Sequence, residues 1–133
     1  MTIKEIYNLS INKGIEADFR GRPKIEKQFA KLNEKYQKME DGRKAEFDLE
    51  RLKNPFSDTR ILFGDPEKEI KRILVGIDID GEELLLATKL ENIDLVFSHH
   101  PRGKALAGLD DVMRLQIDVL AQYGVPVNIA EKL

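Results

Sequence analysis

The chain has 133 residues, a length typical of one domain, and 41% of them are hydrophobic, which is enough to build a core. Its net charge of −2 gives no electrostatic case for binding nucleic acid, because that binding requires a basic surface. The sequence has no cysteine, which excludes disulfides and thiolate metal sites and leaves imidazole and carboxylate as the ligands for any transition metal.

The first 54 residues are expected to form a helical N-terminal extension. Thr2 and Glu5 fit a capping box at the start of a first helix, in which each side chain satisfies a backbone N–H near the helix end. Gly14 is a plausible end for this helix, and residues 15–22 are expected to form a loop. Pro23 then suits the first turn of a second helix.

The second helix is expected to carry a narrow apolar stripe. Residues at steps of four and three share one helix face, and this spacing relates Ile25, Phe29, Leu32, Tyr36 and Met39. The stripe fits either a helix packed on its own domain or a helix that binds a partner, as in a short coiled coil. We favour the first interpretation, because the stripe covers fewer than three heptads.

Residues 55–133 are expected to form an α/β lobe that makes one compact unit with the extension. A short strand is expected over residues 59–63. From residue 70 the order is β-α-β-α-β, with strands over residues 70–77, 93–97 and 125–130. The helices between them begin near Asp80, with a leucine-rich core face, and at Leu109, the latter stopped by Gly124. Helical crossovers imply a parallel or mixed sheet, and the apolar first strand suggests burial on both faces.

Polar residues follow all three strands of this predicted sheet. Asp78 and Asp80 follow the first, His99 and His100 follow the second, and Glu131 follows the third. Ligands of open α/β sheets bind beyond the carboxyl ends of the strands, and parallel strands bring these ends to one edge. Imidazole and carboxylate suit Zn²⁺, Mn²⁺, Fe²⁺ or Ni²⁺, so a divalent-metal site at the histidine pair is the leading hypothesis.

Other interpretations of these residues stay open. The histidines could form a hydrogen-bonded pair that fastens the loop, or could act in acid–base chemistry or phosphate binding. Acids near helix starts are often caps or favourable N-terminal charges, which applies to Asp78, Asp80, Asp110 and Asp111. Arg102 and Lys104 could contact a phosphate, although long cations near a chain turn are more often exposed to solvent.

The stretch IDLVFSHHPRG resembles the signature of the Nif-three-like family (NGG-one-interacting-factor-three-like, also described as type-two GTP cyclohydrolase I homologues), in which an apolar strand runs into a His-His-Pro turn. RILVGIDIDGEELLLA and GVPVNIAE resemble the flanking parts, so the resemblance covers roughly residues 55–133. It implies a site for two divalent metal ions with His99 and His100 as ligands. Glu131 occupies the position of a further ligand.

The resemblance implies a metal-dependent hydrolase acting on a phosphoester or nucleotide-type substrate, with Asp78 orienting a histidine N–H. It also implies a homo-oligomer. Family members carry further ligands in a second lobe, so this chain is expected to be an incomplete lobe. The alternative is a non-enzymatic metal-binding or regulatory module. The sequence lacks a membrane span and a signal-peptide pattern, and a cytoplasmic protein is therefore expected.

Overall fold

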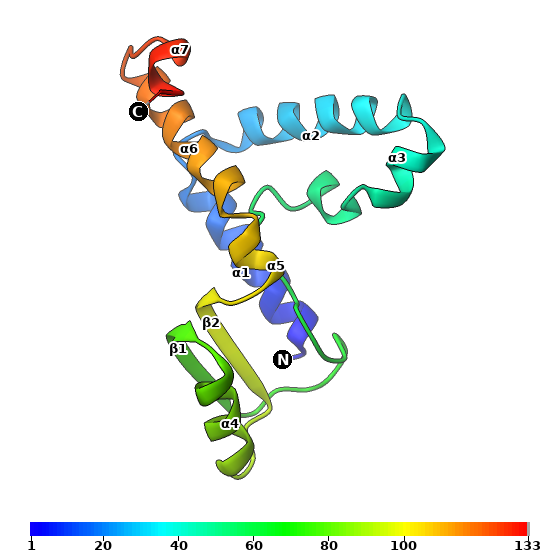
Figure 1. Cartoon of the computed structure of the whole chain (residues 1–133), viewed down its shortest axis with the longest axis vertical. Coiled ribbons are helices and arrows are strands. Elements are labelled where there is room, and N and C mark those ends of the chain that lie inside the picture. Colours follow the sequence, from blue (N-terminus) through cyan, green and yellow to red (C-terminus); the bar gives the residue numbers. More distant parts are fainter. Residues whose placement is uncertain (133) are drawn as a thin grey trace. The chain divides into compact units, whose positions relative to one another are not determined.

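The computed structural model describes residues 1–132, apart from the side chain of Asp111, and it is an α/β protein (Figure 1). The chain divides into two compact units. Unit 1 combines Met1–Ser10 with Asp58–Asp110, and unit 2 combines Ile11–Ser57 with the chain from Asp111 onward. Each unit therefore takes residues from both sides of the predicted boundary at residue 55. Among the described helices, none has both the length and the apolar character that a membrane crossing requires.

Unit 1 is built on a parallel β-α-β element, as predicted. Strands β1 (Ile73–Ile79) and β2 (Leu95–Pro101) pair in parallel and are connected through helix α4 (Gly81–Lys89). Their register places Ile73 opposite Leu95 and Asp78 opposite His100. The predicted acidic start of α4 is confirmed, because Asp80 and Glu83 form a capping box at its N-terminus. The Asp80 side chain accepts the Gly81 N–H at 2.7 Å.

The predicted core face of α4 and the predicted burial of both sheet faces are wrong. Leu84, Leu85 and Leu86 are 50%, 61% and 51% exposed, and Val75 and Ile77 of β1 are 68% and 65% exposed. The described sheet has two strands. So narrow a sheet offers few neighbours that could cover these side chains.

Helix α1 (Ile3–Ala17) begins as predicted and ends later than predicted. Glu5 accepts the Thr2 N–H at 2.8 Å, and the Thr2 hydroxyl accepts the Glu5 N–H at 3.2 Å, which confirms the capping box. The predicted end at Gly14 is wrong, because the helix continues to Ala17. Gly14 instead gives room to an aromatic ring: a Cβ at this position would lie 2.6 Å from Cε2 of Phe56.

Unit 2 contains the amphipathic helix α2 (Arg22–Gln37), with Pro23 in its first turn as predicted. Ile25 is 1% exposed, and the other four residues of the apolar stripe are half-buried, which supports a helix that packs on its own unit. The chain continues through α3 (Asp41–Glu46) and the 3₁₀ helix η1 (Leu49–Leu52). The ring of Tyr36 lies 5.0 Å from that of Phe47, so the segment after α2 folds back on this face.

Two predicted strands are absent from the described residues. Residues 59–63 have no regular secondary structure, and Phe63 is 96% exposed. The strand predicted over residues 125–130 is replaced by a short helix, α7 (Val127–Ala130), with Pro126 as its N-cap. The expected β-α-β-α-β order therefore ends after its second strand, because the last apolar segment becomes helical.

The turn before α7 explains this helix. Helices α5 (Lys104–Ala107) and α6 (Leu109–Gln122) follow β2. Gly124 has φ 87° just after the end of α6, where the Val125 N–H donates to the Leu120 carbonyl at 3.0 Å. This is the Schellman arrangement, and it confirms the predicted stop at Gly124. Pro126, with φ −56°, then starts a new helical turn.

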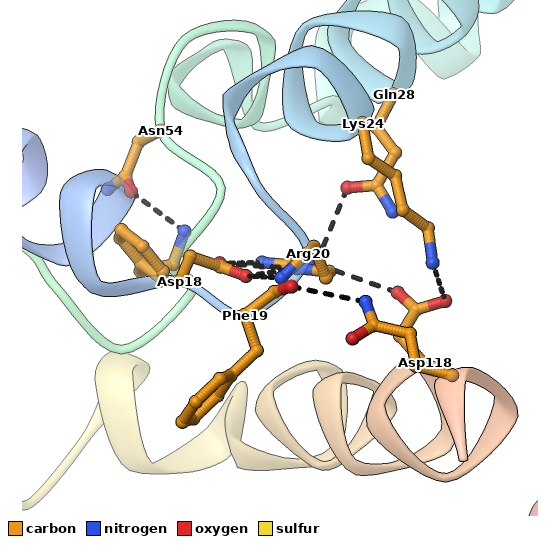
Figure 2. Close-up of polar contacts among 9 residues, drawn as sticks. Asp18, Phe19, Arg20, Lys24, Gln28, Asn54 and Asp118 are labelled. Atoms are coloured by element: carbon orange, nitrogen blue, oxygen red, sulfur yellow. Dashed lines mark hydrogen bonds and ion pairs between the residues drawn. The ribbon is translucent and has the colours of Figure 1, made fainter.

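A buried ion pair just after the end of α1 contacts helices α2 and α6 (Figure 2). Asp18 is 1% and Arg20 10% exposed at the side chain, and their closest N···O distance is 2.7 Å. Arg20 also lies 3.4 Å from Oε1 of Gln28 on α2 and 3.9 Å from Asp118 on α6. Burial alone would raise the pKa of Asp18, but the hydrogen bonds and charge of Arg20 outweigh burial and hold that pKa below its ordinary value.

The variant Asp18→Asn is predicted to destabilise the protein by about 3 kcal/mol at neutral pH, because it leaves the Arg20 charge buried without its partner. A lowered carboxyl pKa stabilises the fold above the unfolded value of about 4, and this stabilisation is lost as the pH falls through the lower folded value. Below about pH 4, the free energy of unfolding of the parent should therefore no longer exceed that of the variant. Urea unfolding across this pH range measures the difference.

The matched control is Glu16→Gln, which removes a nearby carboxylate in the last turn of α1. Glu16 pairs with Lys13 at 2.8 Å, but both side chains are more than half exposed. Loss of such a pair should cost less than about 1 kcal/mol. Equal destabilisation by the two variants would contradict the prediction that the buried Asp18–Arg20 pair stabilises the fold more than an exposed pair does.

Candidate functional site

The two histidines lie within β2, which extends to Pro101 and so passes the predicted end at residue 97. Neighbouring residues of a regular strand ordinarily point to opposite faces. The rings of His99 and His100 nevertheless stack, with centroids 4.3 Å apart and planes inclined by 22°. The structure therefore brings both imidazoles of the chain to one place near the carboxyl end of β2.

Asp78 joins this pair through the neighbouring strand. It is the register partner of His100, and its Oδ1 lies 3.1 Å from Nδ1 of His100. In the tautomer with a proton on Nδ1, His100 donates this hydrogen bond and leaves Nε2 with a free lone pair. The side chains of His100 and Asp78 are 48% and 87% exposed, so the cluster is open to solvent.

The residues beside the cluster are engaged in local structure. Asp80 caps α4, and its Oδ2 lies 3.0 Å from Nε of Arg102. Ser98 precedes the histidines and donates to the Ile77 carbonyl of β1 at 3.3 Å. The alternative of a helix cap is thereby confirmed for Asp80. Arg102, which follows β2, therefore pairs with the cap of α4.

The histidine cluster is not a complete set of metal ligands. Within the described part of the chain, no group of three or more histidine, aspartate or glutamate side chains is placed to hold a metal ion. A catalytic zinc site uses three protein ligands and one open position. Of the residues predicted at the site, the structure brings together His99, His100 and Asp78, and Asp78 is hydrogen-bonded to His100.

The remaining candidates come from other elements of the chain. Glu131 is the C-cap of α7 and belongs to unit 2, whereas the histidines belong to unit 1. Glu131 does not follow a strand, because α7 replaces the predicted one, so its ligand role stays a prediction from the resemblance alone. Asp110 lies in the first turn of α6, and Lys104 is the first residue of α5. The side chain of Asp111 lies outside the described residues.

Sequence reasoning missed a polar centre in unit 2. A pocket of about 590 Å³ there is lined by side chains that include Arg20, Arg51, Arg114 and Glu131. The three arginines come from separate segments with no recognisable spacing. Only the folding of unit 2 brings the segment before α2, η1 and α6 to the same pocket, so the sequence alone carries no signal for it.

Comparison of the chain with protein-family models, with curated proteins and with solved structures finds no match. The resemblance to the Nif-three-like family therefore depends on the residues around the His99–His100 pair and stays a prediction. Function has to be argued from this motif together with the geometry of the cluster.

Proposed function

We propose that this chain binds a divalent metal ion, Zn²⁺, Mn²⁺, Fe²⁺ or Ni²⁺, through the imidazoles of His99 and His100. The observation that carries the proposal is the 3.1 Å contact between Nδ1 of His100 and Asp78. Metal-binding histidines usually donate their other N–H to a carboxylate or carbonyl, which fixes the tautomer and makes the ligand nitrogen more basic. The position of Asp78 on the neighbouring strand, opposite His100, supports this role.

The second imidazole supports the same proposal. His99 lies against His100 with a centroid distance of 4.3 Å, so two neutral ligands of the type that suits these ions are adjacent. Both are accessible, because the site is exposed. Two ligands are too few for a closed structural site, and the open positions are what a substrate or water requires.

From the resemblance, we propose that the bound ion serves the hydrolysis of a phosphoester or nucleotide-type substrate. A divalent ion activates water and stabilises negative charge on an oxygen. The contribution of this chain is then to hold the ion through His99 and His100 and to orient His100 through Asp78.

Zinc affinity tests the site directly. In isothermal titration calorimetry, His99→Ala/His100→Ala should abolish specific Zn²⁺ binding, because both ligands are gone. Asp78→Asn should weaken binding by about 10- to 100-fold, since it removes the acceptor that orients His100. The control Ser98→Ala lies in the same strand and should keep the affinity of the parent.

Two results would separate this proposal from a hydrogen-bonded pair that only fastens the loop. Equal zinc affinity in the parent and the double variant would rule out the metal site. A lowered melting temperature with unchanged zinc affinity would assign the histidines to the structure of the turn. The metal-free parent and Ser98→Ala give the reference melting temperatures.

A non-enzymatic metal-binding or regulatory module is the second candidate, and the shortage of ligands among the described residues favours it. Hydrolysis of p-nitrophenyl phosphate in the presence of Zn²⁺ or Mn²⁺ distinguishes the two. A hydrolase should turn over this ester, and the rate should fall to background in His99→Ala/His100→Ala but not in Ser98→Ala. Zinc binding without turnover by the parent would favour the module.

We also propose that the chain forms a homo-oligomer through the exposed apolar face of unit 1. Ile73, Val75 and Ile77 alternate along β1, and Phe97 is the register partner of Val75, so all four lie on one sheet face. They are 43%, 68%, 65% and 41% exposed. A contiguous apolar surface of this kind is uncommon on a monomer and is typical of an interface.

Self-association is predicted to fall at least tenfold in Val75→Glu, because the interface would have to bury a carboxylate. Sedimentation velocity across a range of protein concentrations measures the association constant. The control Tyr123→Glu places the same charge on an 84% exposed aromatic residue of unit 2 and should leave association unchanged. A parent that stays monomeric, or an equal effect of both variants, would contradict this interface.

A further inference from the structure

Helices α2 and α3 of unit 2 line a second pocket, which is rich in cations. Its volume of about 580 Å³ lies within the range of small-molecule sites. Four cations line it: Lys31 and Lys35 of α2, Lys38 at the C-cap of α2, and Arg43 of α3. This lysine pocket shares no lining residue with the pocket near Arg20, so the two are separate places in the unit.

The charges of the lysine pocket do not cancel. Glu34 and Glu40 are the two carboxylates of the lining. Glu34 has the i,i+4 spacing that suits an ion pair with Lys38. Among the described side chains, however, no carboxylate lies within ion-pairing distance of any of the four cations. The pocket therefore carries a net positive charge, which favours an anion.

The lysines of α2 are spaced so that like charges lie side by side. Lys31 and Lys35 are four residues apart, and Lys38 follows three residues later. Like charges at these spacings destabilise a helix, and an anion bound beside them relieves the repulsion. The negative end of the helix dipole accounts for Lys35 in the last turn but not for Lys31 one turn earlier, because the dipole acts within the last turn only. A bound anion explains the whole series.

Aromatic contacts hold the second wall of the lysine pocket in place. The ring of Tyr36 on α2 lies 5.0 Å from the ring of Phe47, and Nζ of Lys44 lies 5.9 Å from the Tyr36 centroid. Lys44 directly follows Arg43, so these contacts fix the part of α3 that carries Arg43. A pocket whose walls are fixed binds its ligand at a lower entropic cost than one that must first be ordered.

We propose that the lysine pocket binds a compact anion that carries two or more linked phosphate groups. Each lysine acts as a point charge for a phosphate, and the guanidinium of Arg43 can pair with two oxygens of one group. A single phosphate would engage only part of this lining.

The other features of the lysine pocket favour a compact ligand over a macromolecule. Among the described lining residues, Met39 alone is apolar, so recognition depends little on an organic body. A concave pocket also suits a small ligand better than a flat membrane surface. The net charge of −2 of the whole chain opposes the binding of long nucleic acids.

Inorganic triphosphate is a suitable probe, because it presents linked phosphates without an organic body. In a ¹H–¹⁵N NMR titration of the full chain it should cause saturable shifts at the amides of Lys35 and Arg43. Orthophosphate at the same ionic strength should bind at least about tenfold more weakly, since it engages fewer cations at once. The titration is carried out in EDTA, so its outcome does not depend on the proposed metal site.

Charge variants test the lining. Lys31→Gln, Lys35→Gln and Arg43→Gln should each weaken triphosphate binding by about fivefold or more. The control Lys27→Gln removes an exposed lysine of the same helix that does not line the pocket, and it should change the affinity by less than about twofold. Glu34→Gln should tighten binding by about two- to fivefold, because it removes a repulsive charge. This gain cannot arise from misfolding.

Three results would overturn the proposal: no saturable shift at these amides in the parent, orthophosphate binding as tight as that of triphosphate, or weaker binding in Glu34→Gln. An equal effect of Lys27→Gln and Lys31→Gln would also contradict it. That outcome would assign the lysines of α2 to an extended surface for a nucleic acid or a membrane.

Discussion

The parallel pairing of β1 with β2 determines what the histidine site can be. Its register places Asp78 beside His100. The position of this carboxylate is therefore fixed by the backbone hydrogen bonds of the sheet, since Asp78 does not lie in a flexible loop. The same sheet has only two strands among the described residues, which leaves alternate side chains of β1 exposed. One structural feature therefore accounts for both the geometry of the site and the apolar face beside it.

Unit 2 depends on a different interaction, the buried pair of Asp18 and Arg20. Removing two charges from water is costly, and such a pair is retained only when its geometry is good and its remaining donors are satisfied. Arg20 meets this condition, because it reaches Asp18 at 2.7 Å, Gln28 at 3.4 Å and Asp118 at 3.9 Å.

The parts of the fold that could be predicted from the sequence are those decided within a few residues. The capping box of Thr2 and the stop at Gly124 need only their local neighbours. The role of the glycine at position 14 could not be predicted from its neighbours, because the absence of a side chain there makes room for the ring of Phe56 from a distant segment. Periodicity cannot distinguish a short apolar strand from a short buried helix, and this ambiguity explains why residues 125–130 were predicted as a strand. The proximity of Asp78 to His100 could be predicted, since the carboxyl ends of parallel strands meet at one edge. The arginines that line the pocket of unit 2 could not be predicted to lie together, because they share no sequence motif.

The missing third strand also bears on the chemistry of the histidines. The predicted site needed three adjacent strand ends, and the described sheet provides two, so fewer candidate ligands meet at its edge than the prediction required. The exposed face of β1 belongs to the same sheet as His99 and His100. If a second copy covers that face and contributes a ligand, metal binding and self-association become thermodynamically linked, because an ion that binds only the assembled form stabilises it by mass action. Zinc would then strengthen the oligomer, and dilution would weaken zinc binding. If water or substrate completes the coordination instead, zinc affinity would be independent of protein concentration.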